Sequence, residues 1–365
     1  MDVIFDYQIF RLQKYGGISR YFIELAKHLQ HINGCNPFII ATNSINEYLH
    51  ELHNEKIYHE ESYLLKKATY NRFWDYRDEY AELLLNLKIN KQSILHETYY
   101  THRLPSKLKR VITIHDMIYE LKGQNLSEKE LVLNTKKEAI EQADHIIAVS
   151  ENTKQDLLQF YPEAKNKVTV VHHGITKTQH KQIMPFNNDK PYILFVGNRE
   201  GYKNFESLLE VYIANSEINK NFDLICFGGD SFYNNEIESI NKYNLQFQVK
   251  HLKGNDDLLN SLYKGASVLA YLSNYEGFGL PVLEAMWLNC PVICSNGSSL
   301  PEVAGNCAQL INVEDKQEIL NALNKILFSK DNFKDMIDAG KNRAESFSWQ
   351  KCAEETYNVY KGLQN

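Results

Sequence analysis

The sequence predicts an α/β protein made of two doubly wound, Rossmann-like domains, and three observations support this fold class. The chain has 365 residues, more than one ordinary hydrophobic core accommodates. Short apolar runs alternate with amphipathic stretches of helical period, as in parallel βαβ units. The alternation stops at a polar segment containing Pro185 and Pro191 and then restarts. We therefore expect two domains that face each other across a cleft, with ligands beyond the carboxyl ends of the strands.

The first half contains five apolar runs of strand length. The predicted strands are 36–42, 93–96, 111–115, 145–149 and 168–172. Apolar residues recur at helical spacing in three other stretches, the last of which is stopped by a proline. The predicted helices are 18–30, 66–85 and 150–161. The first half is thus expected to form one parallel sheet with helices on its faces.

The second half repeats this alternation after the polar segment. Its predicted strands are 192–196, 222–227, 248–252, 268–272, 292–295 and 308–311. Its predicted helices are 205–215, 256–264, 281–289, 316–328 and an amphipathic C-terminal helix at 349–360. We divide the chain into an N-terminal domain (1–180), a linker (181–191), a C-terminal domain (192–345) and a C-terminal segment (346–365).

Composition excludes several classes of protein. Residues 1–185 carry 24 basic and 23 acidic side chains, and the formal charge of the whole chain is −6, so no nucleic-acid partner is expected. No apolar run reaches the ~20 residues that span a bilayer, and the N-terminus does not resemble a signal peptide. The six cysteines include no Cys-x-x-Cys pair, which favours buried thiols in a reducing compartment. A cytoplasmic location is therefore expected.

The most informative segment lies between two carboxylates, Glu276 and Glu284, where a predicted strand leads into a predicted helix. Gly277 and Gly279 allow the backbone to approach a ligand closely, and Pro281 suits the first turn of a helix. Free amides at the helix start favour a bound anion such as a diphosphate. The carboxylates suit pairs of sugar hydroxyls, because they act only as acceptors. The alternative is a solvated loop glutamate and a glutamate that complements the helix dipole.

A second segment supplies positive charge. Arg199 and Lys203 are four residues apart in the turn that follows predicted strand 192–196, so both are expected to reach one point near the next helix. Two cations and helix amides would neutralise a departing diphosphate. The chain has no Asp-x-Asp sequence, so neither a metal site nor any other cofactor is predicted. The alternative is a helix cap with solvated charges.

Two weaker signals lie in the first half. Gly16 and Gly17 open the predicted helix 18–30, where they permit close approach of a ligand, although an ordinary tight turn explains them equally well. His115 ends a predicted strand, at the edge of the sheet where ligands bind. His96 also ends a strand, so the pair favours a polar cleft, although a lone histidine in such a place is more often structural.

Taken together, these segments resemble the retaining glycosyltransferases of family 4, which have the GT-B architecture. The resemblance covers nearly the whole chain, and the Glu-x7-Glu segment from Glu276 to Glu284 is its most specific part. Pro301-Glu302-Val303 is similar to another family feature. Phe347-Ser348-Trp349 resembles the start of a C-terminal helix that crosses back to the first domain.

The resemblance implies roles for the residues of the glycine loop and its two glutamates. Glu284 would bind the ribose hydroxyls of a nucleotide, and Glu276 would hold the transferred sugar. The loop amides would bind the sugar and the diphosphate; they belong to Gly277, Phe278, Gly279 and Leu280. The implied reaction is a front-face substitution that retains anomeric configuration, in which the leaving phosphate oxygen helps to deprotonate the acceptor.

The resemblance also implies roles for the remaining candidates. Arg199 and Lys203 would stabilise the leaving diphosphate. Gly16 and Gly17 would approach the donor phosphates or the acceptor, and His115 would contact the donor sugar. One departure is that Lys203 is followed by asparagine, where the family more often has glycine.

The stretches beginning at His96 and His115 resemble a subgroup of bacterial mannosyltransferases of surface-polysaccharide assembly. This favours GDP-mannose as the donor and a saccharide or lipid-linked saccharide as the acceptor. A lipid-linked acceptor would require peripheral contact with the inner face of the cytoplasmic membrane, for which the basic cluster 107–110 is a candidate, although a solvated basic turn explains it equally well.

Two other functions are compatible with these sequence features. A sugar-nucleotide epimerase or a phosphorylase can have the same architecture, although no lysine here stands in a context that suggests pyridoxal phosphate. A non-catalytic nucleotide-sugar-binding protein would not need cations at a leaving group. A dinucleotide dehydrogenase fits poorly, because no Gly-x-Gly-x-x-Gly follows the first strand.

Overall fold

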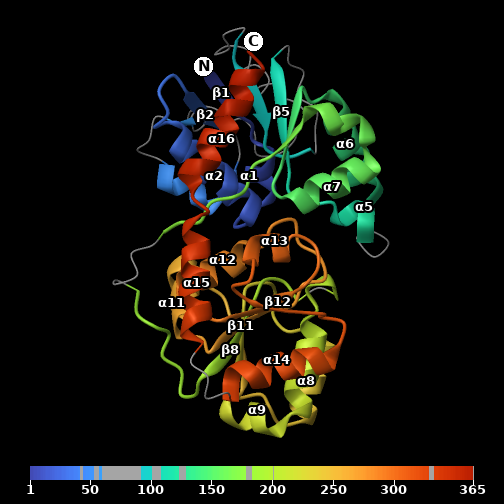
Figure 1. The fold of residues 1–365 in the computed structure, drawn as a ribbon, viewed down its shortest axis with the longest axis vertical. Coiled ribbons are helices and arrows are strands. Elements are labelled where there is room, and N and C mark those ends of the chain that lie inside the picture. Colours follow the sequence, from blue (N-terminus) through green and yellow to red (C-terminus); the bar gives the residue numbers. More distant parts are fainter. Residues whose placement is uncertain are drawn as a thin grey trace, which may run out of the picture. The chain divides into compact units, whose positions relative to one another are not determined.

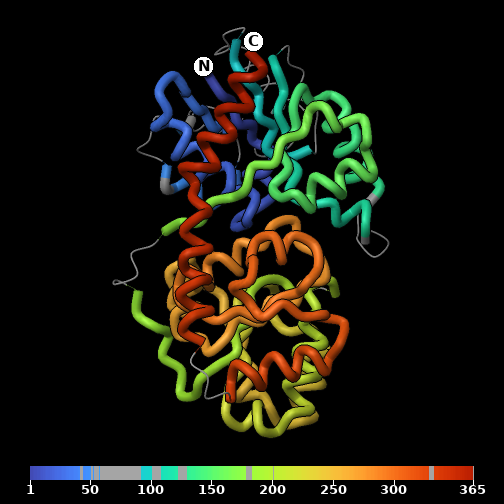
Figure 2. Tube along the Cα trace, viewed as in Figure 1, coloured from blue at the N-terminus to red at the C-terminus, as the bar shows by residue number. Residues whose placement is uncertain are grey.

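The protein folds into two compact units (Figures 1 and 2), one formed by Met1–Gly174 with Ser348–Asn365 and the other by Ile175–Phe347. The computed structural model describes residues 1–41, 44–52, 57–59, 92–100, 108–122, 129–177, 183–199, 201–328 and 333–364. The predicted helix 66–85 and residues 178–182 of the polar segment lie outside this part of the chain. The predicted linker, 181–191, falls within the bounds of the second unit.

The first unit is built on a seven-stranded sheet in which every neighbouring pair is parallel, in the order β3-β2-β1-β4-β5-β6-β7. Its strands are β1 (Asp2–Phe5), β2 (Asn36–Ile40), β3 (Tyr58–His59), β4 (Ile94–Glu97), β5 (Lys109–Ile114), β6 (His145–Ala148) and β7 (Val168–Val170). The strand order reverses between β1 and β4. Crevices at such reversals are where open α/β sheets bind ligands.

Helices cover both faces of this sheet. They are α1 (Gln8–Leu12), α2 (Gly17–Leu29), α5 (Ile118–Lys122), α6 (Lys129–Gln142), α7 (Glu151–Phe160) and α16 (Trp349–Gly362), with 3₁₀ turns η1 (Glu47–Leu52) and η3 (Pro162–Lys167). Helices α2 and α16 lie side by side on one face (Figure 1) and share a hydrophobic core with β1. Apolar residues of α6 and α7 pack with β5 and β6 in a second core. The C-terminal helix is thus an integral part of the first unit.

The second unit is built on a six-stranded parallel sheet in the order β10-β9-β8-β11-β12-β13. Its strands are β8 (Tyr192–Val196), β9 (Asp223–Phe227), β10 (Val249–Leu252), β11 (Val268–Tyr271), β12 (Val292–Ser295) and β13 (Gln309–Ile311). All residues of β8 and β11 are buried, as expected for central strands covered on both faces. The reversal of strand order falls between β8 and β11.

The helices of the second unit follow its strands in sequence. They are α8 (Phe205–Ala214), α9 (Ser216–Asn221), α10 (Asn234–Lys242), α11 (Asp256–Gly265), α12 (Leu280–Trp287), α13 (Leu300–Ala304), α14 (Lys316–Phe328) and α15 (Lys334–Glu345), with the 3₁₀ turn η4 at Gly201–Lys203. Helices α8 and α14 pack together, and so do α12 and α15. The predicted fold class, two doubly wound α/β domains, is confirmed by the two parallel sheets.

Strand β1 occupies the centre of a sheet and yet was not predicted from the sequence. Strand β1 pairs with β2 on one side and β4 on the other. It has only four residues and begins at the second residue of the chain, so it gives too short an apolar run to be distinguished by periodicity. Its carboxyl end leads into Asp6, which is fully buried and accepts hydrogen bonds from Thr98 after β4.

Candidate active site

Two loops of the second unit meet where its strand order reverses. One follows β8 and contains Arg199 and Lys203, and the other follows β11 and contains Glu276 and the glycine loop. The backbone N–H of Asn274 donates to the carbonyl of Tyr202 over 2.8 Å, which ties the loops together. Residues predicted separately from two stretches of sequence therefore share one edge of one sheet.

The centre of this edge is an ion pair between Lys203 and Glu276. Lys203 Nζ donates to Glu276 Oε1 over 2.5 Å, and both side chains are largely buried. The ammonium lies 5.0 Å from the ring centroid of Tyr202 and 5.6 Å from that of Tyr271. Burial acts to lower the pKa of Lys203, but Tyr271, Glu276 and Tyr202 outweigh it and raise the pKa overall. Lys203 therefore stays protonated at neutral pH.

Each glutamate of the Glu-x7-Glu segment is also contacted by a tyrosine hydroxyl. Tyr271, the last residue of β11, donates to Glu276, and Tyr263 of α11 donates to Glu284 Oε2 over 3.2 Å. Both tyrosines are buried, and neither was singled out in the sequence, where an isolated tyrosine gives no functional signal. Helix α12 begins at Leu280, which places Glu284 in its second turn.

The glycine loop is shaped by a backbone conformation and by two serines. Gly279 has a φ of 105°, in the left-handed region that favours glycine, and a Cβ there would lie 2.5 Å from Leu300 Cδ2. Ser299 Oγ donates to the carbonyls of Glu276 and Phe278, each over 2.9 Å, and Ser298 Oγ accepts from the N–H of Glu276. Both serines follow β12, the strand next to β11, so the loop after β12 holds the glycine loop in place.

Arg199 lies in a different setting from Lys203. Its Nε donates to both carboxylate oxygens of Glu236, and its Nη2 donates to the carbonyls of Asp230 and Ser231. The side chain is 1% exposed, and Nη1 has no hydrogen-bond partner in the described part of the chain. The loop after β9 thus engages Arg199, whereas Lys203 pairs with Glu276, and a shared point of action for the two cations stays a prediction.

His115 belongs to a buried aromatic cluster in the first unit. Its ring lies 5.1 Å from Tyr21 and 5.6 Å from His173, and Nε2 has no hydrogen-bond partner among the described residues. Burial lowers the pKa of His115 to about 3, with smaller contributions from His96 and Lys136. At neutral pH the imidazole is therefore uncharged and can serve as a hydrogen-bonding group but not as a cation.

His96 is a structural residue of this cluster. Its Nδ1 lies 2.6 Å from the hydroxyl of Tyr360 on α16, and its Nε2 lies 2.8 Å from Thr113 Oγ1. The side chain is fully buried, and burial lowers its pKa to about 3. His96 thus joins the sheet to the C-terminal helix.

Gly16 and Gly17 stand where the sequence places them, at the start of α2. Gly16 is the residue before the helix and has an extended φ of 178°, and a Cβ on Gly17 would meet nothing within 4 Å. The side-chain carbonyl of Gln13 accepts from the N–H of Ser19 over 3.1 Å. One amide of the first turn is therefore already occupied by this chain's own glutamine.

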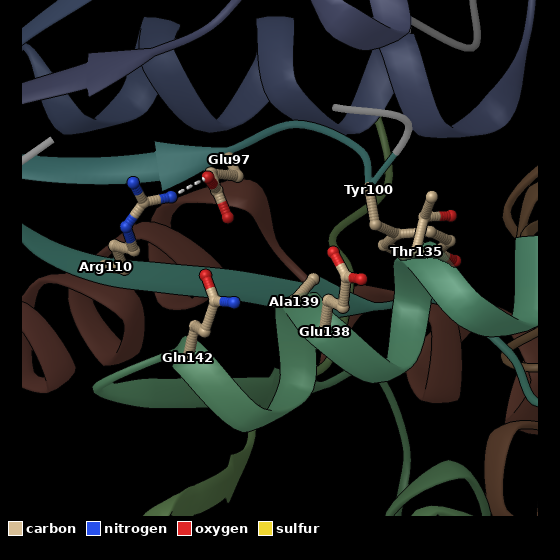
Figure 3. Close-up of a pocket in the computed structure, with 7 residues that line it drawn as sticks. All are labelled: Glu97, Tyr100, Arg110, Thr135, Glu138, Ala139 and Gln142. Carbon is tan, nitrogen blue, oxygen red and sulfur yellow. Dashed lines mark hydrogen bonds and ion pairs between the residues drawn. The ribbon is translucent and has the colours of Figure 1, made fainter. Parts of the chain in front are cut away.

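A small cavity of about 30 Å³ lies between α6 and the strands β4 and β5 (Figure 3), large enough for about one or two waters. A buried ion pair between Arg110 and Glu97 lies at one end of it. Arg110 belongs to the basic cluster 107–110, a candidate for membrane contact or a solvated basic turn, and its burial keeps it from either role. Lys109 of the same cluster is paired with Asp144 over 2.7 Å.

No group of three or more histidine, cysteine, aspartate or glutamate side chains is arranged to hold a metal ion in the part of the chain that the structure describes. Over the same residues, no helix is both long enough and apolar enough to cross a membrane. All six cysteines are free thiols, and five of them are buried.

Comparison with protein families gives two matches that follow each other along the chain. Residues 15–179 match the model described as Glycosyltransferase Family 4, and residues 176–343 match that described as Glycosyl transferases group 1. Together the two matches extend over both units and include every candidate site residue.

Two curated relatives are bacterial enzymes. The chain is 27% identical over 276 residues to the O-antigen chain mannosyltransferase B of Escherichia coli, covering 71% of this chain and 72% of the relative. It is 26% identical over 256 residues to the O-antigen chain mannosyltransferase RfbU of Salmonella typhimurium, covering 69% of this chain and 70% of that relative.

Among solved structures, HepE of Anabaena, in complex with UDP and glucose, aligns over the full length of both chains with a TM-score of 0.75 and 15% identity. That likeness confirms the fold.

Proposed function

The chain belongs to glycosyltransferase family 4, with the GT-B fold, and on this premise we propose that it transfers mannose from GDP-mannose to a hydroxyl of a saccharide acceptor. The proposed transfer retains the configuration of the anomeric carbon and uses no metal ion. The mannosyltransferase relatives support the choice of sugar, and their place in O-antigen synthesis supports a growing polysaccharide as the acceptor.

The observation that carries the proposal is the Lys203–Glu276 pair beside the glycine loop that opens α12. An ammonium beside the positive end of a helix dipole forms a site for a diphosphate. Before the donor binds, Glu276 neutralises Lys203. When it binds, Lys203 would turn to the phosphates, and Glu276 would be released to accept hydrogen bonds from sugar hydroxyls. Glu284 would bind the ribose.

The proposed reaction needs no nucleophile from the protein. The bond between the anomeric carbon and the leaving phosphate oxygen breaks, and a bond to the acceptor oxygen forms on the same face. The proton of the acceptor hydroxyl moves to the departing phosphate, so atoms and charge balance. Lys203 would stabilise the negative charge that grows on the diphosphate. In this role the ammonium would take the place of a metal ion.

Residues outside this group keep their predicted roles as part of the proposal. Arg199 would donate to the diphosphate through Nη1, its one guanidinium nitrogen with no hydrogen-bond partner among the described residues. The uncharged imidazole of His115 would hydrogen-bond the sugar. Gly16 and Gly17 would approach the donor or the acceptor through their backbone.

The proposal is tested with a panel of nucleotide sugars. A thermal-shift series should show stabilisation by GDP-mannose above UDP-glucose and UDP-galactose, because a ligand at 100 times its Kd stabilises by about 2.7 kcal/mol. The same panel is then incubated with octyl α-mannoside, and GDP release and product are measured with and without EDTA. A protein stabilised by none of these donors would refute the proposal, and activity that is lost in EDTA and restored by Mg²⁺ would refute the metal-independent part.

A further inference from the structure

Both glutamates of the proposed donor site accept a hydrogen bond from a buried tyrosine. We propose that Tyr271 and Tyr263 are positioning residues, whose hydroxyls hold the carboxylates of Glu276 and Glu284 in place before the donor binds and while Lys203 turns to the phosphates. Tyr271 is 4% exposed and Tyr263 is fully buried, so their hydroxyls contact the site only through other side chains. The proposal rests on the proposed function, because it takes Glu276 and Glu284 as donor ligands.

Tyr271 contacts several parts of the site at once. Its hydroxyl donates to the carboxylate of Glu276, and its ring lies 5.6 Å from the ammonium of Lys203. Its Cε1 would lie 4.0 Å from a Cβ on Gly279, so the ring also lies beneath the glycine loop. Tyr271 ends β11, which pairs with β8 and β12 in the middle of the sheet. The rigid centre of the sheet thereby sets the position of the ion pair.

Tyr263 plays the corresponding part for the second glutamate. It belongs to α11, which packs against α12, and its hydroxyl donates to Glu284 Oε2 over 3.2 Å. Helix α12 alone fixes where the backbone of Glu284 lies, but a glutamate side chain has three rotatable bonds. The contact with Tyr263 selects the rotamers that present the carboxylate in one place, which lowers the entropic cost of binding a ribose.

The two tyrosines are expected to act on different kinetic constants. Glu284 would contact the ribose equally in the ground state and the transition state, so misplacing it weakens binding uniformly. Glu276 and Lys203 adjoin the reacting centre, so misplacing them lowers the rate of the chemical step. A hydrogen bond to a charged group is strong enough that its loss changes either constant by about tenfold or more.

The test uses tyrosine-to-phenylalanine substitutions, which remove one hydroxyl and leave the ring in place. For Tyr263→Phe we expect KM for GDP-mannose to rise about tenfold with little change in kcat, and for Tyr271→Phe we expect kcat to fall about tenfold. Tyr212→Phe is the matched control. Tyr212 is also fully buried in the second unit, but its hydroxyl donates to the carbonyl of Phe222 over 2.7 Å, just before β9 and away from the site.

All three variants are expected to lose similar thermal stability. The decisive measurement is therefore whether each substitution changes KM or kcat. If the changes of Tyr263→Phe and Tyr271→Phe match those of Tyr212→Phe, the tyrosines are merely structural and the inference is overturned. Glu276→Gln and Glu284→Gln are measured alongside. If neither glutamine variant alters kcat or KM, the proposed function itself fails. If the glutamine variants do alter these constants but the tyrosine variants do not, only the inference about the tyrosines fails.

Discussion

At the scale of single residues, Lys203 is the group on which the proposed chemistry depends most. It is paired with Glu276 beside the glycine loop, and its pKa is raised despite burial, so it stays charged over the whole range in which the protein would be assayed. Its partner Glu276 prevents an isolated charge from being buried in the free protein. The pair is therefore stable without a donor and can be rearranged by one.

We predict that Lys203→Ala lowers kcat by about 10²–10³-fold, the usual effect of losing one preorganised electrostatic group. Glu284→Gln should act mainly on KM for the donor, because ribose contacts exist before and during the reaction. Initial rates over a range of donor concentrations give both constants, and circular dichroism checks the fold. Near-normal kcat in Lys203→Ala would show that the diphosphate binds elsewhere.

Arg199 calls for a different prediction because of Glu236. Removing the arginine alone leaves a buried carboxylate without its partner, which typically costs about 3–5 kcal/mol. Arg199→Met should therefore be strongly destabilised, whatever its catalytic role. The double variant Arg199→Met with Glu236→Gln removes both charges and keeps an acceptor for the N–H of Tyr233, which Glu236 Oε2 now binds over 2.7 Å. We expect it to regain much of the lost stability, measured by urea unfolding.

The double variant also decides whether Arg199 takes part in the reaction. If Nη1 contacts the diphosphate as proposed, the double variant should fold and yet remain at least about tenfold slower than the wild type. If it turns over at the wild-type rate, Arg199 serves only to attach the loop after β9. Thermal melting and kcat are measured on the same preparation, so that unfolded protein is not mistaken for inactive protein.

The sequence predicted the site's charged residues but not their partners. Charged and glycine residues in the turns after strands carry a local signal, because such turns lie at the ligand edge of the sheet. Tyr263, the partner of Glu284, is 21 residues away from it, and Lys203, which pairs with Glu276, is 73 residues away, each on another element. Glu236 could not be matched with Arg199 for the same reason. Only the packing of the elements reveals these pairs.

At the scale of elements, the loop between β11 and α12 shows how a short motif builds a site. The left-handed backbone at Gly279 turns the chain into α12, and Ser299 holds the loop from the side of β12. This strand, loop and helix could be predicted because apolar runs and a glycine-proline boundary coincide here. The sequence pattern did not predict α1, α5, α6, α9, α10, α13 and α15. Four of these, α1, α5, α9 and α13, have only five or six residues, too few to show a helical period.

We predict that Gly279→Ala impairs donor binding. The left-handed conformation costs a non-glycine residue roughly 1–2 kcal/mol, and the new methyl group would meet Leu300 Cδ2 at 2.5 Å. Gly305→Ala is the control, since Gly305 also has a positive φ of 57° but lies after α13, outside the glycine loop. Both variants should lose stability, whereas only Gly279→Ala should weaken GDP-mannose in isothermal titration. Equal affinities would contradict the assigned role of the loop.

At the scale of the whole molecule, the two units differ in how they bury titratable groups. The first unit buries three histidines, His96, His115 and His173, among the aromatic residues that join β5, α2 and α16. His173 stacks on Tyr21 at 4.7 Å, and burial lowers its pKa well below the usual 6.5. Burial also raises the pKa of the Asp6 carboxyl in this unit. The second unit has no such histidine cluster among its described residues.

We predict from this difference that acid destabilises the first unit before the second. A histidine whose pKa is about 3 when folded and 6.5 when unfolded binds its proton in the unfolded state first, so its contribution to stability is complete above pH 6.5 and is lost as the pH falls toward 3. Within that window each such histidine lowers the free energy of unfolding by about 1.4 kcal/mol for every pH unit that the pH falls. Asp6, whose pKa is raised in the folded state, offsets part of this loss at the acidic end of the window.

Hydrogen exchange at pH 7.5 and pH 5, corrected for the intrinsic rate at each pH, should show protection lost in 1–174 and 348–364 and kept in 183–347. His96→Gln removes one titrating group, so it should be less stable than the wild type at pH 7.5 but lose less protection between the two pH values. Equal loss of protection in both units would mean that the histidine cluster does not control the response to acid.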